Sequence, residues 1–288
     1  MDFKMFFLKE GSRLYDQPDL ITLLTSNRNI ISPNPNENVG KKVYLYHHDI
    51  LNFEAQFVIS NKSVVPHIET LDPRYYDVNF YVAFDVLLSN YAVSMLLDIV
   101  QEICIRYGFK IYIESFGNEV KSFRRNDVMQ TFSVWKRSFA EKYPEKVANY
   151  KRLDSQAFAQ VYTYLQSKKR LELTNFSEKI QVSNYYFFHT DRSRSAFVAI
   201  KWDGERPFIL PPAVDILILD DGHIVKQVPM IQVLSKTEKM FKPIDGKGEI
   251  QMLEGKYVNK LHKFLVKEKF APPNFELHDL SLENILDV

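Results

Sequence analysis

The sequence predicts an α+β protein in which an N-terminal mixed sheet with packed helices is followed by an antiparallel, β-rich C-terminal module with a closing helix. Three observations support this prediction. Apolar and polar residues alternate in several short segments, as they do in half-buried strands. Longer segments between residues 90 and 170 instead repeat apolar residues every three or four positions, as helices do. The composition, 45% hydrophobic and 25% charged over 288 residues, is that of a folded globular chain.

The N-terminal strands are expected where the alternation is clearest, at 3–10, 42–50, 53–60 and 78–88. A long loop is expected at 25–42, which is dense in Asn, Pro and Ser. The clearest helix is expected at 90–107, because its apolar face ends at Gly108, a residue typical of helix C-termini. We expect Glu102 and Arg106 to pair on its outer side. A strand at 109–115 follows at once, so this order predicts a split βαβ layer.

Two further helices are expected near 126–143 and 155–170, with Ser155 as the N-cap of the second. Apolar residues recur in both at helical spacing, which predicts one buried stripe for each helix. The aromatic members of these stripes are Phe132, Trp135, Phe139, Phe158 and Tyr162. We place a domain boundary near residue 175, giving an α+β domain at 1–175 and a second domain at 176–288.

The second domain is expected to be an antiparallel meander with a last helix near 253–267 and an acidic tail. Asp-Gly pairs at 203–204 and 221–222 predict tight turns between apolar runs. The expected strands are 184–191, 196–202, 206–210, 214–219 and 223–234. The polar segment 189–195 contains His, Asp and Ser residues, but it lacks the setting of a nucleophile elbow and is typical of a hairpin loop.

The segment PPAVDILILDDGHIVK (Pro211–Lys226) concentrates acids, a histidine and a lysine around an apolar run. It invites comparison with metal-dependent nuclease sites, in which a second strand carries an acid two residues before a lysine. Ile224 stands at that position, so the required acid is missing. The sequence therefore predicts a structural hairpin with a two-residue turn, Leu217 opposite Lys226 and Asp215 diagonal to Lys226.

Motifs for nucleotide or cofactor binding are absent from the sequence: neither GxGxxG nor GxxxxGK[ST] occurs. The short "DGKGEI" segment at 245–250 is typical of a turn. A single cysteine, Cys104, excludes an internal disulfide and a multi-cysteine zinc site, and its apolar surroundings predict a buried thiol. We therefore expect no catalytic, cofactor-binding or metal-binding residue, and the sequence does not favour an enzyme.

The histidines leave one open question about metal binding. His47 and Asp49 share one face of a predicted strand, whereas His48 points to the other face. Two ligands do not define a metal site, so a third would have to come from elsewhere. The candidates for that third ligand are His67, His189 and His223.

Charge is uneven along the chain although the net charge is only +1. Between Glu119 and Arg170 there are twelve basic and five acidic residues. The aromatic residues of this region either stack on a ligand beside the basic residues or form the buried stripes beneath a solvated basic face, and their helical spacing favours the second interpretation. The residues with the potential to bind nucleic acid or a partner are Lys136, Arg137, Lys151, Arg152, Lys168, Lys169 and Arg170.

Residues after Ala271 include acids and apolar side chains but no Lys or Arg. This pattern predicts an amphipathic segment that docks on the basic helices or on another protein.

For function, the sequence predicts a non-enzymatic interaction protein that binds another protein. The alternative is a nucleic-acid-associated protein that uses the basic region 119–170. We expect a cytoplasmic location without membrane association, because no signal peptide pattern and no apolar run of membrane-spanning length is visible.

Overall fold

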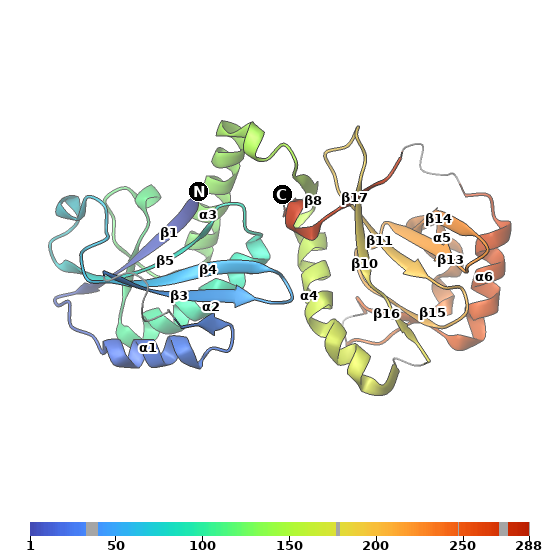
Figure 1. Ribbon diagram of the computed structural model, residues 1–288, viewed down its shortest axis with the longest axis horizontal. Coiled ribbons are helices and arrows are strands. Elements are labelled where there is room, and N and C mark those ends of the chain that lie inside the picture. The colour runs from blue at the N-terminus through green and yellow to red at the C-terminus, as the bar shows by residue number, and fades with distance from the viewer. Residues whose placement is uncertain (33–39, 177–178, 247, 271–275, 288) are drawn as a thin grey trace. The chain divides into compact units, whose positions relative to one another are not determined.

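The computed structural model describes residues 1–32, 40–176, 179–246, 248–270 and 276–287 (Figure 1). The chain forms two compact units, unit 1 at Met1–Ala148 and unit 2 at Asn149–Val288. The division falls before α4 (Ser155–Leu171), earlier than the boundary expected near residue 175. The hydroxyl of Tyr164 on α4 donates to Ser183 O at 2.8 Å, and its ring lies edge-on to Tyr185. These contacts join α4 to the C-terminal strands.

Unit 1 is built on a seven-stranded sheet in the order β2-β3-β4-β5-β1-β6-β7. Its strands are β1 (Asp2–Glu10), β2 (Ile30–Ile31), β3 (Lys41–His48), β4 (Phe53–Ser60), β5 (Tyr75–Asp85), β6 (Lys110–Tyr112) and β7 (Lys121–Ser122). Because β1 lies between β5 and β6 and is antiparallel to both, β5 and β6 run parallel to each other. The expected split βαβ layer is therefore confirmed.

Three α-helices accompany this sheet: α1 (Gln17–Ser26), α2 (Asn90–Tyr107) and α3 (Arg125–Lys142). Helix α2 has the expected bounds, with the Ser89 hydroxyl accepting from Ala92 N–H and Gly108 in the left-handed conformation, φ 68°. Helix α1 was not expected from the sequence. It begins after Asp16, whose carboxylate accepts from Asp19 N–H, and Pro18 lies in its first turn.

Aromatic packing fixes α3 against the sheet. Phe3 of β1 lies edge-on to both Phe132 and Trp135 of α3, with ring centroids 5.4 Å and 5.2 Å apart. Phe132 and Phe139 are buried. The aromatic residues of α3 therefore form a core stripe, as their spacing predicts, and are not free to stack on a ligand.

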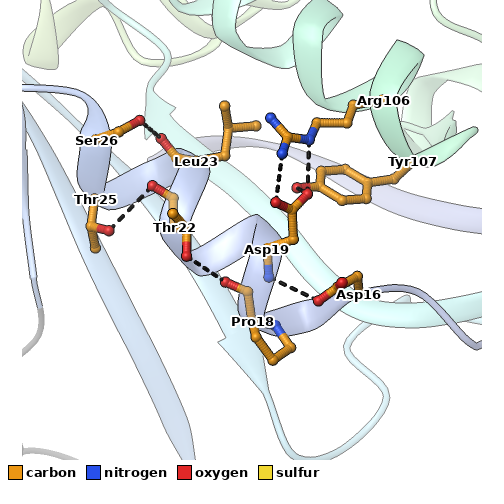
Figure 2. A network of polar contacts seen from close by, with 9 residues as sticks. All are labelled: Asp16, Pro18, Asp19, Thr22, Leu23, Thr25, Ser26, Arg106 and Tyr107. Atoms are coloured by element: carbon orange, nitrogen blue, oxygen red, sulfur yellow. Dashed lines mark hydrogen bonds and ion pairs between the residues drawn. The ribbon is translucent and has the colours of Figure 1, made fainter.

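A polar network connects α1 to α2 (Figure 2). The Asp19 carboxylate accepts from the Arg106 guanidinium at 2.5 and 2.8 Å and from the Tyr107 hydroxyl at 2.8 Å. The hydrogen bond from Tyr107, followed by that from Arg106, lowers the pKa of Asp19. Arg106 therefore pairs with α1, and the expected pairing with Glu102 is wrong: a bidentate contact between helices holds the guanidinium.

Unit 2 contains a five-stranded sheet in the order β14-β13-β11-β10-β17 and a four-stranded sheet in the order β15-β16-β12-β9. The first sheet comprises β10 (Tyr185–His189), β11 (Phe197–Trp202), β13 (Ile216–Asp220), β14 (Val225–Pro229) and β17 (His278–Leu280). The second comprises β9 (Gln181–Val182), β12 (Phe208–Leu210), β15 (Phe241–Pro243) and β16 (Gln251–Leu253). These sheets are antiparallel except for two pairs, β11 with β13 and β9 with β12.

Helices α5 (Met230–Thr237) and α6 (Val258–Lys267) cover one face of the five-stranded sheet. Val233 of α5 and Leu261 of α6 share a buried cluster with Leu219 of β13. The closing helix is confirmed, although α6 begins later than expected. The strand expected at 223–234 is wrong after Pro229, because the following residues bury Met230, Val233 and Thr237 at helical spacing.

The hairpin of β13 and β14 has a longer turn than the sequence predicts. The Asp221 carboxylate accepts from the backbone N–H groups of His223 and Ile224, and Leu219 rather than Leu217 lies opposite Lys226. The register differs by two residues, so each side chain keeps its expected face.

Lys226 and Asp215 do not pair with each other. Lys226 Nζ donates to Leu265 O and Glu268 O, both at 2.7 Å, at the C-terminus of α6. The Asp215 carboxylate accepts from Val198 N–H at 2.8 Å. Helix carbonyls without an intrahelical partner attract a cation more strongly than a diagonal carboxylate does, which explains why the lysine turns toward α6.

The C-terminal segment adds strands to unit 2. Strand β17 pairs with β10, and β18 (Ile285–Asp287) runs parallel to β8 (Lys151–Leu153). Ile285 and Leu286 are buried. The segment therefore docks within the chain as two short strands, beside two of the predicted basic residues, and not as an amphipathic segment on a helix.

Two expectations about composition concern membrane-spanning helices and the single cysteine. No helix among the residues that the structure describes combines the length and apolar character needed to cross a membrane. Cys104 is buried, and burial raises the pKa of its thiol to about 12.

We predict that Asp19→Asn lowers the Tm of the full chain, because it removes the charge that holds Arg106 and Tyr107. The lowered pKa means that the ionised carboxylate stabilises the folded state fully above pH 3.8, the ordinary value of the carboxyl, and that this contribution is lost as pH falls through the lower folded pKa. Thermal denaturation at several pH values measures this. Glu102→Gln on α2, the helix that carries Arg106 and Tyr107, is the control and should leave Tm nearly unchanged.

We predict that Lys226→Met lowers the free energy of unfolding by about 1–3 kcal/mol, because the last carbonyls of α6 lose a charged donor. Urea denaturation measures the change. The control is Lys263→Met, an exposed lysine of the same helix. Equal losses in the two variants would contradict the assigned role of Lys226.

Candidate binding pocket at the ends of strands β11 and β13

The parallel pair β11 and β13 defines the candidate site. Ala199 lies opposite Ile216 and Trp202 opposite Leu219, so the carboxyl ends of both strands meet at one edge of the sheet. Ligands of sheets with parallel strands commonly bind outside these ends. Asp203 follows β11, and Asp220 ends β13.

A pocket with a volume of about 320 Å³ lies at this edge. This volume is at the lower end of the range for small-ligand sites. Strand β9 contributes Gln181 and Val182, Asn184 immediately precedes β10, and Tyr186 belongs to β10. Two ion pairs complete the lining. The ring of Tyr186 gives the pocket an aromatic wall, and the residue is 41% exposed.

Lys201 and Asp220 form the first ion pair, with Nζ 2.6 Å from Oδ2. Gly222 N–H donates to the other carboxylate oxygen of Asp220 at 3.3 Å. The hydrogen bond from Lys201 and then that from Gly222 lower the pKa of Asp220, and the same contact raises the pKa of Lys201. Both side chains therefore stay charged at neutral pH.

Asp203 and Arg206 form the second ion pair within one turn. Oδ2 of Asp203 accepts from Nε of Arg206 at 2.8 Å, and Oδ1 accepts from the backbone N–H groups of Glu205 and Arg206. Burial acts to raise the pKa of Asp203, but these hydrogen bonds outweigh it and lower the pKa. The Gln181 side chain supports the turn by accepting from Asp203 N–H and donating to Lys201 O.

The charged groups of this pocket are suited to hold a polar ligand. A general acid or base works best when its pKa lies near the ambient pH, whereas the pKa values of Asp203, Asp220 and Lys201 all move away from neutrality. The pocket therefore combines fixed charges, amide groups and an aromatic ring, which is a recognition chemistry.

The face of the five-stranded sheet that carries Tyr186 and Lys201 is apolar beside the pocket. Tyr186 lies opposite Ala199, and Lys201 lies opposite Ile218, so these residues point to one side. We call this side the outer face, since α5 and α6 pack on the other. Its buried members Ala199, Ile216 and Ile218 pack against partly exposed Phe188, Phe197 and Leu277. Val225 on β14, opposite Asp220, is 70% exposed.

Asp221 and His262 fasten α6 to the same strand ends. The Asp221 carboxylate lies 2.8 Å from Nε2 of His262, and this hydrogen bond is the main cause of the lowered pKa of Asp221. Gly204, with φ 80°, lies so close that an added Cβ would be 2.8 Å from the His262 ring. The turn after β11 therefore requires a glycine, and its path sets the positions of Asp203 and Arg206.

The basic residues predicted from the sequence lie on several elements. Lys136 and Arg137 belong to α3 of unit 1. Lys136 is only 6% exposed and donates through Nζ to Leu88 O, with its ammonium over the Phe132 ring. This placement removes Lys136 from the expected basic surface, because its long stem follows the aromatic stripe into the core.

The other predicted basic residues belong to unit 2. Lys151 of β8 donates to Ser193 O, and Lys168 of α4 pairs with Glu172 one turn later. The remaining positions have exposed side chains, and these are Arg137 in unit 1 and Arg152, Lys169 and Arg170 in unit 2. None of the seven residues lines the pocket.

The histidine candidates do not assemble a metal centre. His47 lies 3.4 Å from Asp49 and 3.3 Å from Glu54, but across the described ranges no three His, Cys, Asp or Glu side chains have a geometry that could hold a metal ion. His48 points to the opposite, buried side of β3, as expected. In the 189–195 segment, His189 ends β10 and the remaining residues form a loop. Thr190 and Ser193 hydroxyls close this loop by accepting from backbone N–H groups.

Sequence reasoning did not identify the pocket residues Lys201, Asp203, Arg206 and Asp220. The sequence shows both Asp-Gly pairs, but each pair by itself indicates only a tight turn. The signal that places them together is the parallel pairing of two distant strands, which a local pattern does not contain.

Comparisons with known proteins add no relative: no protein-family model, curated protein or solved structure matches the chain.

We predict that Gly204→Ala destabilises the protein more than Gly222→Ala does. Both glycines have φ near 80°, so each substitution carries a backbone cost of about 1 kcal/mol. Only at Gly204 does the new methyl group also collide with His262 and Leu219, whereas at Gly222 nothing lies within 4 Å. Equilibrium unfolding of both variants measures the difference, and equal losses would refute the close-approach argument.

Proposed function

We propose that the protein binds another protein through the outer face of the five-stranded sheet and the pocket at its edge. The observation that carries this proposal is the continuity of an apolar sheet face with a polar pocket in one surface. Apolar side chains that remain partly exposed beside fixed polar groups are typical of protein-binding surfaces. We place this interaction in the cytoplasm.

The residues of this surface suit protein recognition. Tyr186 presents an exposed ring between the apolar face and the pocket, and tyrosine is among the residues that contribute most to protein interfaces. Phe188 on the same strand and Phe197 on the neighbouring strand β11 add apolar area. The partner surface that fits is an apolar ridge flanked by a polar side chain that enters the pocket.

Site-specific photo-crosslinking tests this proposal. A photoreactive phenylalanine analogue replaces Tyr186 in the full chain, expressed in the cells of its source, and the control position is Ile105, an exposed residue of α2 in unit 1. We expect a defined polypeptide to be cross-linked at position 186 and not at 105. After its identification by mass spectrometry, the purified partner should bind the wild-type chain.

The matched variants for that binding measurement are Val225→Asp on the outer face and Ile105→Asp as the control, because both residues are exposed. We expect Val225→Asp to weaken binding about tenfold, since a charge then enters the apolar contact. Cross-links to nucleic acid at 186, or retention on heparin that falls steeply with salt, would contradict this function and favour the nucleic-acid alternative.

A further inference from the structure

The free hydrogen-bonding capacity of the pocket is unequal between donors and acceptors. Both oxygens of Asp203 accept hydrogen bonds from the turn and from Arg206. The two oxygens of Asp220 accept from Gly222 N–H and Lys201. The acceptors of both acids are therefore already engaged inside the protein.

The donors of the pocket are not used up in the same way. A lysine ammonium has three N–H donors, and among the described residues that of Lys201 contacts only Asp220. Arg206 uses Nε and Nη2 on Asp203, so Nη1 points away from that pair. Asn184 and the Tyr186 hydroxyl also line the pocket, and neither has a hydrogen-bond partner in the described part of the chain.

The cationic side chains of the pocket are also more exposed than the acidic ones. The side chains of Lys201 and Arg206 are each 48% exposed, whereas those of their partners Asp220 and Asp203 are 27% and 29% exposed. Each pair thus turns its cation toward solvent and its acid toward the protein. A ligand that enters the pocket meets donors and positive charge first.

We propose that this pocket binds a carboxylate group of the partner polypeptide, held by Lys201 and Arg206 and oriented by the Asn184 amide and the Tyr186 hydroxyl. A guanidinium and an ammonium together match the two oxygens of a carboxylate with charge-assisted hydrogen bonds. The carboxylate comes from an acidic side chain or from the free C-terminus of that polypeptide. The inference therefore rests on the proposed protein-binding function.

The charge balance of the pocket favours a monoanion over a dianion. Its two cations are matched by two carboxylates, so the four groups sum to zero, and a dianion such as phosphate would meet repulsion from both acids. A single negative charge can share the two cations without removing either acid from its backbone donors.

NMR titration of the isotope-labelled full chain tests the inference with small probes. N-acetylglutamic acid α-amide represents an acidic side chain, and N-acetylalanine represents a C-terminal carboxylate. We expect saturable shifts of the Asn184 side-chain amide and the Arg206 Nε–H signal with both, and the tighter probe identifies the source. N-acetylglutamine α-amide, the neutral isostere, should bind with an affinity that is lower by about tenfold or more.

Variants separate the pocket from nonspecific charge effects. Lys201→Met and Arg206→Gln should each remove the saturable shift of the Asn184 side-chain amide. Lys236→Met on α5, which breaks an exposed ion pair with Glu268, should retain it. Backbone spectra establish that each variant is folded. Equal binding of the neutral isostere, or tighter binding of inorganic phosphate than of either carboxylate, would overturn the inference.

Failure of this inference differs from failure of the proposed function. If a partner is cross-linked at position 186 and no carboxylate probe binds, only the carboxylate assignment is wrong. If carboxylate probes bind and no polypeptide is cross-linked, the pocket assignment stands and the protein-binding function is wrong.

Discussion

The parallel pairing of β11 and β13 is the constraint on which the candidate site depends. Two parallel neighbours need a connection that leaves the sheet and returns, and here the chain passes through β12 of the second sheet. Both strands consequently end at the same edge, which brings Asp203 and Asp220 into one pocket. An antiparallel pairing would have placed these acids at opposite ends of the sheet.

In the proposed function, the two faces of this sheet divide stability from recognition. On the inner face, Trp202, Leu217 and Leu219 are completely buried beneath α5 and α6, which supplies the hydrophobic stabilisation of unit 2. On the outer face, Lys201 and Asp220 alternate with those core positions and remain accessible. A strand exposes every second residue to the other side, so one short sequence serves both purposes.

Local patterns predicted the elements whose signals are local. The bounds of α2 follow from its apolar face and Gly108, and the aromatic stripe of α3 follows from its spacing. Features that depend on distant segments were missed. Lys226 donates to carbonyls at the end of α6. Helix α5 forms where a strand is predicted, because the apolar residues after Pro229 pack into the core at helical spacing. The pocket belongs to this second class, since two separate turns form it.

We propose that the carboxyl ends of β11 and β13, together with the adjoining outer face, contact the partner. Hydrogen–deuterium exchange of the full chain, with and without the identified partner, measures this most directly. We expect slower exchange on binding at 181–186, 197–206 and 216–225. Protection confined to α3 and the exposed residues of α4, with unchanged exchange at 181–186, 197–206 and 216–225, would contradict the proposal.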